Sequence, residues 1–340
     1  MSNCYSLAIG SGTLNTRGEW LEIWYPYPLL NPDDKLVEAV KSTVGQQTSS
    51  LTDPQLFALA NQLDEAGYTE QANLARSLTD SDKQPVICIL AEDEAPQDVP
   101  AAYLKLHLLS HRLVRPHGTD LSGVFGVLPN VAWTSEGAVD LDELLERQLE
   151  ARQEGRVLSV FCVDKFPRMT DYVIPSGVRI GDTSRVRLGA YLGEGTTVMH
   201  EGFVNFNAGT EGPNMIEGRI SAGVFVGKGS DLGGGCSTMG TLSGGGNVVI
   251  SVGENCLIGA NAGIGIPLGD GCTVEAGLYV TAGTKVKLLD ESGNEVELVK
   301  AAQLAGRNDL LFRRNSQNGA IECLTNKSQI ELNEELHKHN

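Results

Sequence analysis

Basic residues are scarce in this 340-residue chain, which has 26 lysines and arginines against 43 aspartates and glutamates. The formal net charge of −17 argues against nucleic acid or an anionic membrane as the main partner. No stretch approaches the roughly 20 apolar residues that a bilayer-spanning helix needs. The opening letters MSNCYSLAIGSG lack a basic region followed by an apolar run, so we expect no signal peptide. The sequence predicts a soluble protein.

Paired cysteines are also lacking. The seven cysteines are scattered and never form a Cys-x-x-Cys pair, so we expect neither a disulfide framework nor a zinc site. His107 and His111 lie four residues apart, but no acidic or cysteine ligand accompanies them. We interpret them as ordinary surface or packing histidines. A reducing cytoplasm fits this composition best.

Glycine is abundant, at 40 residues, but it follows no Gly-X-Y period, which excludes collagen. Residues 1–172 have ordinary α/β character. The stretch DPQLFALANQL predicts a helix with Asp53 as its N-cap, and PVICIL predicts a buried strand. The stretch DLDELLERQLEARQEG predicts a charged helix that stops at a glycine. We therefore predict an N-terminal α/β domain over residues 1–172.

The middle of the chain, residues 173–287, has a period of six. Aliphatic residues recur at Ile174, Ile180, Val186, Leu192, Val198 and Val204, at Ile220, Val226 and Leu232, at Val252, Ile258 and Ile264, and at Leu268, Val274, Val280 and Val286. Neither a helix nor an ordinary strand has this period, whereas a hexapeptide-repeat β-helix does. A sandwich of irregular strands would not keep the phase over so many units. We predict a left-handed parallel β-helix here.

The phase of six is interrupted at NFNAGTEGPNM and at GTLSGGGNVV. Both stretches are too long for one corner of the coil, so we predict loops that project from it. Residues 288–340 complete the mixed fold as a small C-terminal β region and tail. Asn318 and Gly319 predict a hairpin turn there, and the polar, charged end suggests poor order.

Several long motifs carry a resemblance to a known family. They are DKFPRMTDYVIPSGVRIG, TTVMHEGFVNFNAGT, MIEGRISAG, GSDLGGGCSTMGTLSGGGN, EAGLYVTAGT and LLFRRNS. Together they resemble tetrahydrodipicolinate N-succinyltransferases, in the longer form found in pseudomonads and actinobacteria. The resemblance covers about Asp164 to Ser316, and LKLHLLSHRLVRPHG extends it toward the N-terminus.

This resemblance implies an activity and an assembly. Succinyl-CoA would acylate the amino group of ring-opened or hydrated tetrahydrodipicolinate, giving N-succinyl-2-amino-6-oxopimelate and CoA on the route to diaminopimelate and lysine. It also implies a cytoplasmic homotrimer with active sites between neighbouring coils.

The family's catalytic glutamate corresponds to Glu217 in MIEGR. It could act as a nucleophile that forms an acyl anhydride, or as a general base that takes the amine proton. The sequence leaves both roles open. In the alternative interpretation, Glu217 only pairs with Arg219 or with a neighbouring chain at a corner of the coil.

Family positions for the acyl donor also correspond to residues of this chain. They are Arg219, Gly234, Ser237, Ala260, Glu275, Ala276, Gly283, Lys300, Arg313, Arg314, Asn315 and Ser316. Small residues would let the thin pantetheine arm lie along the coil, while lysine and arginines would meet carboxylate or phosphate groups.

The resemblance further implies a magnesium site on a trimer axis, at the position of Glu201. The second acidic residue of that site is replaced here by Ser184, with Asp182 two residues earlier. A lone carboxylate is a poor magnesium site unless symmetry supplies three copies. We expect any metal to be structural.

Two alternatives to succinyl transfer stay open: an acyltransferase that uses acetyl-CoA on a similar amine, and a trimeric structural protein without catalysis. Carbonic anhydrase, which also occurs on such coils, is set aside because it needs several histidine ligands and the coil has only His200.

Overall fold

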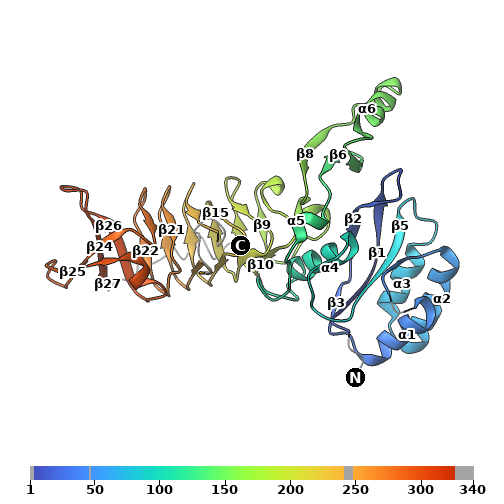
Figure 1. The fold of residues 1–340 in the computed structure, drawn as a ribbon, viewed down its shortest axis with the longest axis horizontal. Coiled ribbons are helices and arrows are strands. Elements are labelled where there is room, and N and C mark those ends of the chain that lie inside the picture. The colour runs from blue at the N-terminus through green and yellow to red at the C-terminus, as the bar shows by residue number, and fades with distance from the viewer. Residues whose placement is uncertain (1–3, 46, 241–247, 326–340) are drawn as a thin grey trace. The chain divides into compact units, whose positions relative to one another are not determined.

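The computed structural model describes residues 4–45, 47–240 and 248–325, which form two compact units (Figure 1). Unit 1 takes the chain up to Val114 with Gly118–Pro167 and Asp171–Val173, and unit 2 takes Arg115–His117, Arg168–Thr170 and the chain from Ile174 onward. Most of GTLSGGGNVV, and the end that we predicted to be poorly ordered, lie outside the described residues. Within the described ranges, no helix has the length and apolar character that crossing a membrane requires.

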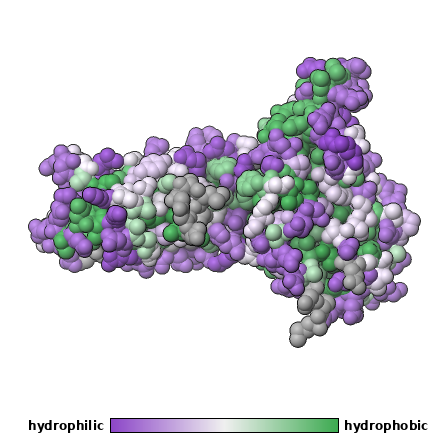
Figure 2. Space-filling model, in the orientation of Figure 1, coloured by the Kyte–Doolittle hydropathy of each residue, from purple (hydrophilic) through white to green (hydrophobic). Residues whose placement is uncertain are grey.

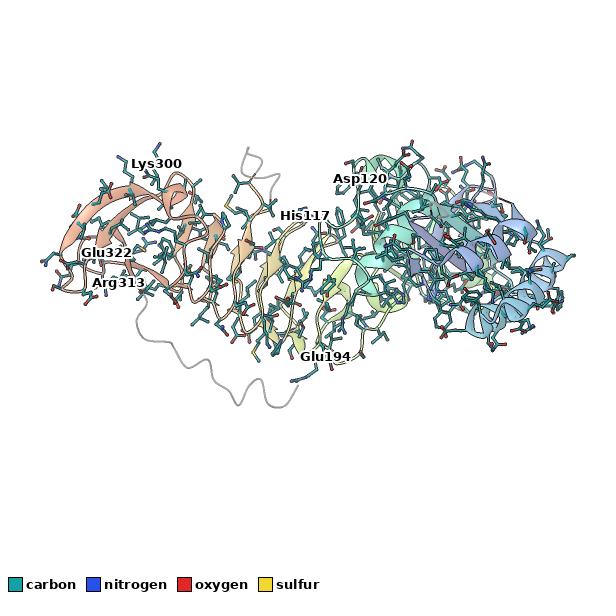
Figure 3. All side chains as sticks on the ribbon, turned by 90° about the horizontal axis from the view of Figure 1, so that it is seen from below. His117, Asp120, Glu194, Lys300, Arg313 and Glu322 are labelled. Atoms are coloured by element: carbon teal, nitrogen blue, oxygen red, sulfur yellow. The ribbon has the colours of Figure 1, made fainter. Side chains whose placement is uncertain are left out.

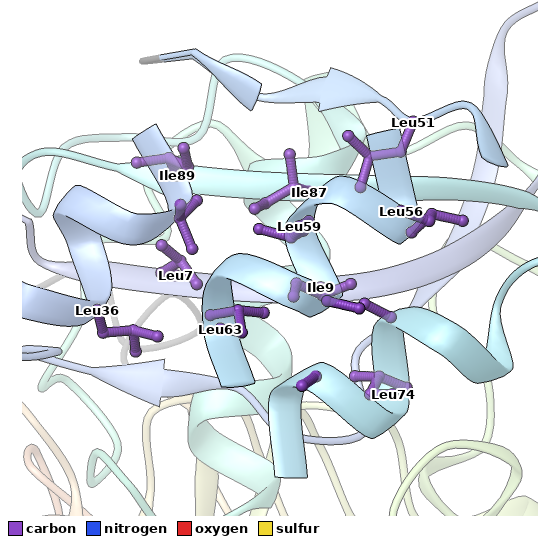
Figure 4. Close-up of a cluster of buried hydrophobic side chains, with 14 of the residues drawn as sticks. Leu7, Ile9, Leu36, Leu51, Leu56, Leu59, Leu63, Leu74, Ile87 and Ile89 are labelled. Atoms are coloured by element: carbon purple, nitrogen blue, oxygen red, sulfur yellow. The ribbon is translucent and has the colours of Figure 1, made fainter. Parts of the chain in front are cut away.

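An antiparallel sheet of order β2-β1-β5-β4, with β3 paired to β1, forms the centre of unit 1. The strands are β1 (Ser6–Leu14), β2 (Trp20–Trp24), β3 (Leu29–Leu30), β4 (Ser49–Ser50) and β5 (Gln84–Leu90). The helices packed on it are α1 (Asp34–Val44), α2 (Asp53–Ala66), α3 (Thr69–Ser77) and α4 (Val99–Ser110). Leucines and isoleucines of β1 and β5 meet those of α1, α2 and α3 in a buried cluster (Figure 4).

The predicted helix and buried strand in this unit are confirmed as α2 and β5. The N-cap prediction was wrong: α2 includes Asp53, and Thr52 is the N-cap. The Thr52 N–H donates to Gln55 Oε1 at 3.0 Å, so Thr52 and Gln55 form a capping box one residue earlier than expected. Pro54 is tolerated in the first turn because its missing N–H would have no partner there.

His107 confirms the packing interpretation. It is fully buried, Nε2 accepts from the Tyr25 N–H at 3.2 Å, and Nδ1 lies 2.8 Å from the Tyr103 carbonyl oxygen. Burial lowers the pKa of His107 to about 3. The unfolded chain therefore binds a proton here that the folded chain does not between about pH 6.5 and 3.

We accordingly expect the free energy of unfolding to decrease as the pH is lowered through that window. This group contributes up to about 1.4 kcal/mol per pH unit. Chemical unfolding of the protein and of His107→Asn across this range measures the contribution. The slope is expected to be shallower in the variant, and equal slopes would contradict the assignment.

The second part of unit 1 is a three-stranded antiparallel sheet of order β7-β6-β8. Its elements are α5 (Val124–Val127), β6 (Val131–Thr134), β7 (Gly137–Asp140), α6 (Leu144–Gln153) and β8 (Val160–Asp164). The predicted charged helix is confirmed as α6, followed by Gly155 with φ +76°. Exposed apolar side chains gather on α6 and β8, including Leu145, Leu149 and Phe161 (Figure 2).

Unit 2 is the predicted left-handed β-helix, with three parallel sheets that form three faces of a coil (Figure 1). Face 1 contains β9 (Arg179–Ile180), β11 (Thr196–Val198), β14 (Asn214–Ile216), β17 (Asp231–Leu232), β20 (Leu257–Ile258) and β22 (Thr273–Val274). Face 2 contains β12 (Phe203–Val204), β15 (Arg219–Ile220), β18 (Ser237–Thr238), β21 (Gly263–Gly265) and β23 (Tyr279–Thr281). Face 3 contains β10 (Ala190–Leu192), β13 (Ala208–Thr210), β16 (Phe225–Val226) and β19 (Ser251–Val252).

The prediction of a projecting loop at NFNAGTEGPNM was wrong, because this stretch forms β13 and β14 within the coil. The period of six continues through Thr210 and Ile216, which are both fully buried. Thr210 escaped a search for aliphatic residues because it is polar. Its Oγ1 lies 2.8 Å from Thr196 Oγ1, so the two hydroxyls satisfy each other inside the coil.

Two antiparallel strand pairs end the coil. They are β24 (Lys285–Leu289) with β25 (Glu295–Lys300), and β26 (Leu310–Arg314) with β27 (Ile321–Thr325). The predicted hairpin is confirmed: β26 and β27 pair around Asn318 and Gly319, and the Asn315 N–H donates to the Ala320 carbonyl at 2.8 Å. Strand β26 also continues face 1 beside β22.

Candidate active site

The corner from face 1 to face 2 is shorter at Glu217 than in the coil before it. The buried, inward-pointing residues Ile216 and Ile220 are four positions apart in the sequence, whereas Val198 and Val204 are six apart. The interruption of the repeat is therefore a shortening at this corner. The shortening places the charged side chain of Glu217 at a tight corner, and the corners before and after it in the stack are longer.

Backbone hydrogen bonds hold Glu217 against the next coil. Its N–H donates to the Leu232 carbonyl at 2.8 Å, and its carbonyl accepts from the Gly235 N–H at 3.3 Å. The side chain is half-buried beside Gly234, where an added Cβ would lie 3.3 Å from Glu217 Oε2. Glycine at 234 therefore leaves space at the carboxylate.

Glu217 and Arg219 do not form an ion pair. Within the described part of the chain, neither side chain makes a hydrogen bond or a salt bridge, and Arg219 is exposed. The interpretation in which the two residues only pair with each other is therefore wrong. A half-buried carboxylate and a guanidinium remain beside each other, available to a ligand.

A buried thiol lies beneath this pair. A Cβ added to Gly218 would lie 2.3 Å from Cys236 Sγ, so only glycine allows so close an approach. Cys236 is fully buried, and burial raises the pKa of its thiol to about 12. A thiol that stays protonated is a poor nucleophile.

We therefore expect Cys236→Ala to keep its acyl-transfer rate near that of the unchanged protein, since the thiolate is not formed at neutral pH. Steady-state kinetics and thiol-alkylation assays check this. A large loss of kcat without a loss of folded protein would instead assign the nucleophile to Cys236.

A row of small residues begins next to Glu217 and runs along the corners between faces 1 and 2. We call Gly234, Ala260 and Ala276 the small-residue edge. A Cβ on Gly233 would lie 2.7 Å from the Ala260 nitrogen, and one on Gly259 would lie 2.5 Å from the Ala276 nitrogen. The corners are thus stacked in contact, with small residues at positions 234, 260 and 276.

Arg314 lies at the far end of the small-residue edge. Its N–H donates to Glu275 Oε2 at 2.6 Å, and the Glu275 N–H donates to the Phe312 carbonyl at 2.9 Å. Glu275 therefore fixes the start of the β26–β27 turn against the last corner. The exposed Arg314 side chain is a cation at the end of a path that starts at a carboxylate.

Of the other residues of RRNS, Arg313 and Asn315 contact Glu322, whereas Ser316 is exposed. Arg313 Nε donates to Glu322 Oε2 at 3.0 Å, and Figure 3 labels both residues. Asn315 Nδ2 donates to Glu322 Oε1 at 2.7 Å. The hydrogen bond from Asn315, together with the Arg313 guanidinium, lowers the pKa of the Glu322 carboxyl. Ser316 is exposed in the turn. Glu322 escaped the sequence analysis, because a two-residue turn at Asn318–Gly319 would place Leu324 opposite Arg313. The observed register is centred on Gln317–Asn318 and places Glu322 there.

The remaining predicted donor residues border face 2. Ser237 pairs with Arg219 in the parallel ladder of that face. Gly283 lies at its other edge, and Lys300 pairs with Lys285 just beyond it. Figure 3 shows Lys300 and Arg313 on opposite sides of the end of the coil.

The predicted metal residue Glu201 lies at the corner of the preceding coil, with His200 Nε2 at 3.3 Å from its Oε1. Asp182 Oδ1 accepts from the Ser184 N–H at 2.9 Å and from the Ser184 hydroxyl at 2.7 Å. Among the residues with described positions, no group of three histidine, cysteine or acidic side chains could hold a metal. A single chain therefore does not fit a magnesium ion.

Comparison with known proteins identifies the family. Family models match residues 55–126 and 128–168, as the N-terminal and middle parts of tetrahydrodipicolinate N-succinyltransferase, and residues 249–282, as a hexapeptide repeat of succinyl-transferase. A 2,3,4,5-tetrahydropyridine-2,6-dicarboxylate N-succinyltransferase of Pseudomonas paraeruginosa is 68% identical, over 99% of this chain and 98% of the relative. The chain belongs to the tetrahydrodipicolinate N-succinyltransferase family. The resemblance seen in the motifs is thereby confirmed.

More distant family members agree. The enzyme of the same name from Vibrio cholerae is 60% identical over 99% of both chains. A crystal structure from Campylobacter jejuni, described as a candidate 2,3,4,5-tetrahydropyridine-2-carboxylate N-succinyltransferase, is 33% identical. It superposes with a TM-score of 0.87 over 96% of this chain and 93% of that one. The fold is therefore shared across the family at low identity.

Proposed function

We propose that this chain transfers the succinyl group of succinyl-CoA to the amino group of ring-opened or hydrated tetrahydrodipicolinate. The products are N-succinyl-2-amino-6-oxopimelate and CoA, on the route to diaminopimelate and lysine. The observation that carries the proposal is the position of Glu217. Its carboxylate has no side-chain partner in the described part of the chain, and it lies where the small-residue edge begins.

Glu217 can serve the reaction in two ways. As a general base it accepts the amine proton while nitrogen attacks the thioester carbonyl; the C–N bond forms, the C–S bond breaks, and the thiolate takes up the proton. As a nucleophile its oxygen displaces CoA first, and the amine then opens the resulting anhydride and returns the carboxylate. A carboxylate that is not engaged in an ion pair suits either route.

The donor is proposed to lie along the small-residue edge, with its thioester at Glu217. Alanines and glycines there expose backbone groups to the pantetheine arm, and Arg314 lies where phosphates would be met. Arg313, Asn315 and Ser316 extend this basic end. Arg219 is proposed to contact a carboxylate or the CoA end of the donor, with Ser237 beside it. The Glu275 carboxylate supports Arg314 by accepting a hydrogen bond from the Arg314 backbone N–H, while Gly283 and Lys300 border face 2.

We further propose a cytoplasmic homotrimer. No disulfide joins the seven cysteines, all of which lie among the described residues, and this suits a reducing compartment. Each chain supplies one Glu201, so three chains around an axis would offer three carboxylates to one magnesium ion. Such an ion would hold the trimer together and would take no part in acyl transfer.

Release of CoA thiol from purified protein tests the reaction. We expect release from succinyl-CoA that depends on tetrahydrodipicolinate and exceeds release from acetyl-CoA. Faster release from acetyl-CoA would move the chain to acetyl transfer with the same chemistry. No release from either donor by a folded trimer would favour a structural role and overturn the proposal.

A further inference from the structure

Face 2 carries a row of three outward positions that runs from Arg219 toward the N-terminal turns of the β-helix. Arg185 precedes Val186, which bridges to Val204, and Phe203 pairs in register with Arg219. The inward neighbours of this row are fully buried, so the three side chains lie on the outer surface of the coil. An aromatic ring thus separates two arginines, and Arg219 adjoins Glu217 through Gly218.

Phe203 is in contact with two guanidinium groups. The guanidinium carbon of Arg185 lies 5.8 Å from the ring centroid, and that of Arg187 lies 5.9 Å from it. Such cation–π contacts orient an arginine without neutralising it. Arg185 therefore keeps its positive charge beside this ring, within a chain of net charge −17.

Neutral oxygens hold Arg185 in place. Its Nε donates to the Gly202 carbonyl at 3.2 Å, and its Nη2 donates to the Glu201 carbonyl at 2.9 Å. It forms no salt bridge with a described carboxylate. Asp182 is close enough for the charge of Arg185 to help lower its pKa, but hydrogen bonds from Ser184 are the main cause. Arg185 is therefore oriented, half-buried and still positively charged.

We propose that Arg185 binds one carboxylate of the acceptor, whose carbon chain lies across Phe203 with its amino group toward Glu217. This inference rests on the proposed function. The donor path leaves Glu217 toward the C-terminal coils, so the acceptor takes the opposite side. Neighbouring strands are about 4.8 Å apart, which places the backbones of Arg185 and Arg219 roughly 10 Å apart. That span matches a seven-carbon dicarboxylate with one acid group near each arginine.

Binding of two simple acids tests the inference apart from turnover. Pimelate has the seven-carbon skeleton with two carboxylates, and heptanoate has the same length with one. We expect the unchanged protein to bind pimelate about 10- to 100-fold more tightly, the usual effect of a hydrogen bond to a charged group. In Arg185→Met this preference is expected to fall to a few-fold, and the KM for the acceptor to rise while that for succinyl-CoA stays constant.

Arg314→Gln is the matched control, because it removes an arginine from the donor end and is expected to keep the pimelate preference. If Arg185→Met does not fold, Arg185→Lys and Phe203→Leu replace it. Arg185→Lys, which keeps the charge, is expected to retain the preference for pimelate. Phe203→Leu is expected to weaken the binding of pimelate and heptanoate equally.

An undiminished preference in Arg185→Met, or no preference in the unchanged protein, would overturn the inference. If the unchanged protein turns over succinyl-CoA, the proposed function stands even then. If the protein shows no turnover but its preference for pimelate depends on Arg185, the inference about Arg185 stands and the proposed function fails.

Discussion

Replacing Glu217 by glutamine is expected to lower kcat for succinyl transfer by about 10²- to 10⁴-fold, the usual contribution of a general base. The amide keeps the size of the side chain but can neither accept the amine proton nor form an acyl anhydride. Because the Glu217 side chain makes no hydrogen bond or ion pair with the described residues, the free energy of unfolding is expected to change by less than about 0.5 kcal/mol. Steady-state kinetics and chemical denaturation measure the two effects separately.

Glu254→Gln is a suitable control for this prediction. Glu254 is an exposed glutamate at another corner of the same β-helix, away from the small-residue edge. It loses the same charge, so the overall electrostatics of the two variants match. Equal kcat in the two variants would remove Glu217 from the chemistry, whatever the other residues do.

Replacing Ala260 by leucine is expected to raise the KM for succinyl-CoA by about 10- to 100-fold. Ala260 is exposed in the middle of the small-residue edge, so a larger side chain would stand in the path of the pantetheine arm. Crowding of this kind costs about 1–3 kcal/mol of binding. The KM for tetrahydrodipicolinate should stay constant, because its proposed position lies on the other side of Glu217.

Lys228→Leu adds an exposed leucine to a corner on a different edge of the coil and is the control for Ala260→Leu. Its KM for succinyl-CoA is expected to match that of the unchanged protein. A similar rise in both variants would show a general effect of surface leucines. No rise in Ala260→Leu would mean that the donor takes another path.

The period of six predicted the coil because each inward position needs an apolar residue at a fixed spacing. The same search failed at Thr210, since two buried hydroxyls can replace an aliphatic pair only when the fold brings Thr196 and Thr210 together. It also took the loss of phase before Ile220 as a projecting loop at NFNAGTEGPNM, whereas the phase changes because the corner at Glu217 is shorter. The sequence alone cannot distinguish a shortened corner from a projecting loop, because the distinction depends on which strands pair with each other.

The candidate site could be predicted only in part. Motif letters pointed to Glu217 and Arg219 but left open whether they pair, which the orientation of their side chains decides. Cys236 and Arg185 gave no signal in the sequence. The role of Cys236 depends on the close approach of Gly218, and that of Arg185 on stacking against Phe203 from another coil. Contacts between coils are fixed by three-dimensional register.

A crystal structure of the trimer with CoA bound tests the central claim most directly. The account predicts that the sulfur lies beside the Glu217 carboxylate, that the pantetheine arm follows Gly234, Ala260 and Ala276, and that phosphates meet Arg314. A CoA molecule bound along face 3, or with its sulfur far from Glu217, would contradict the account.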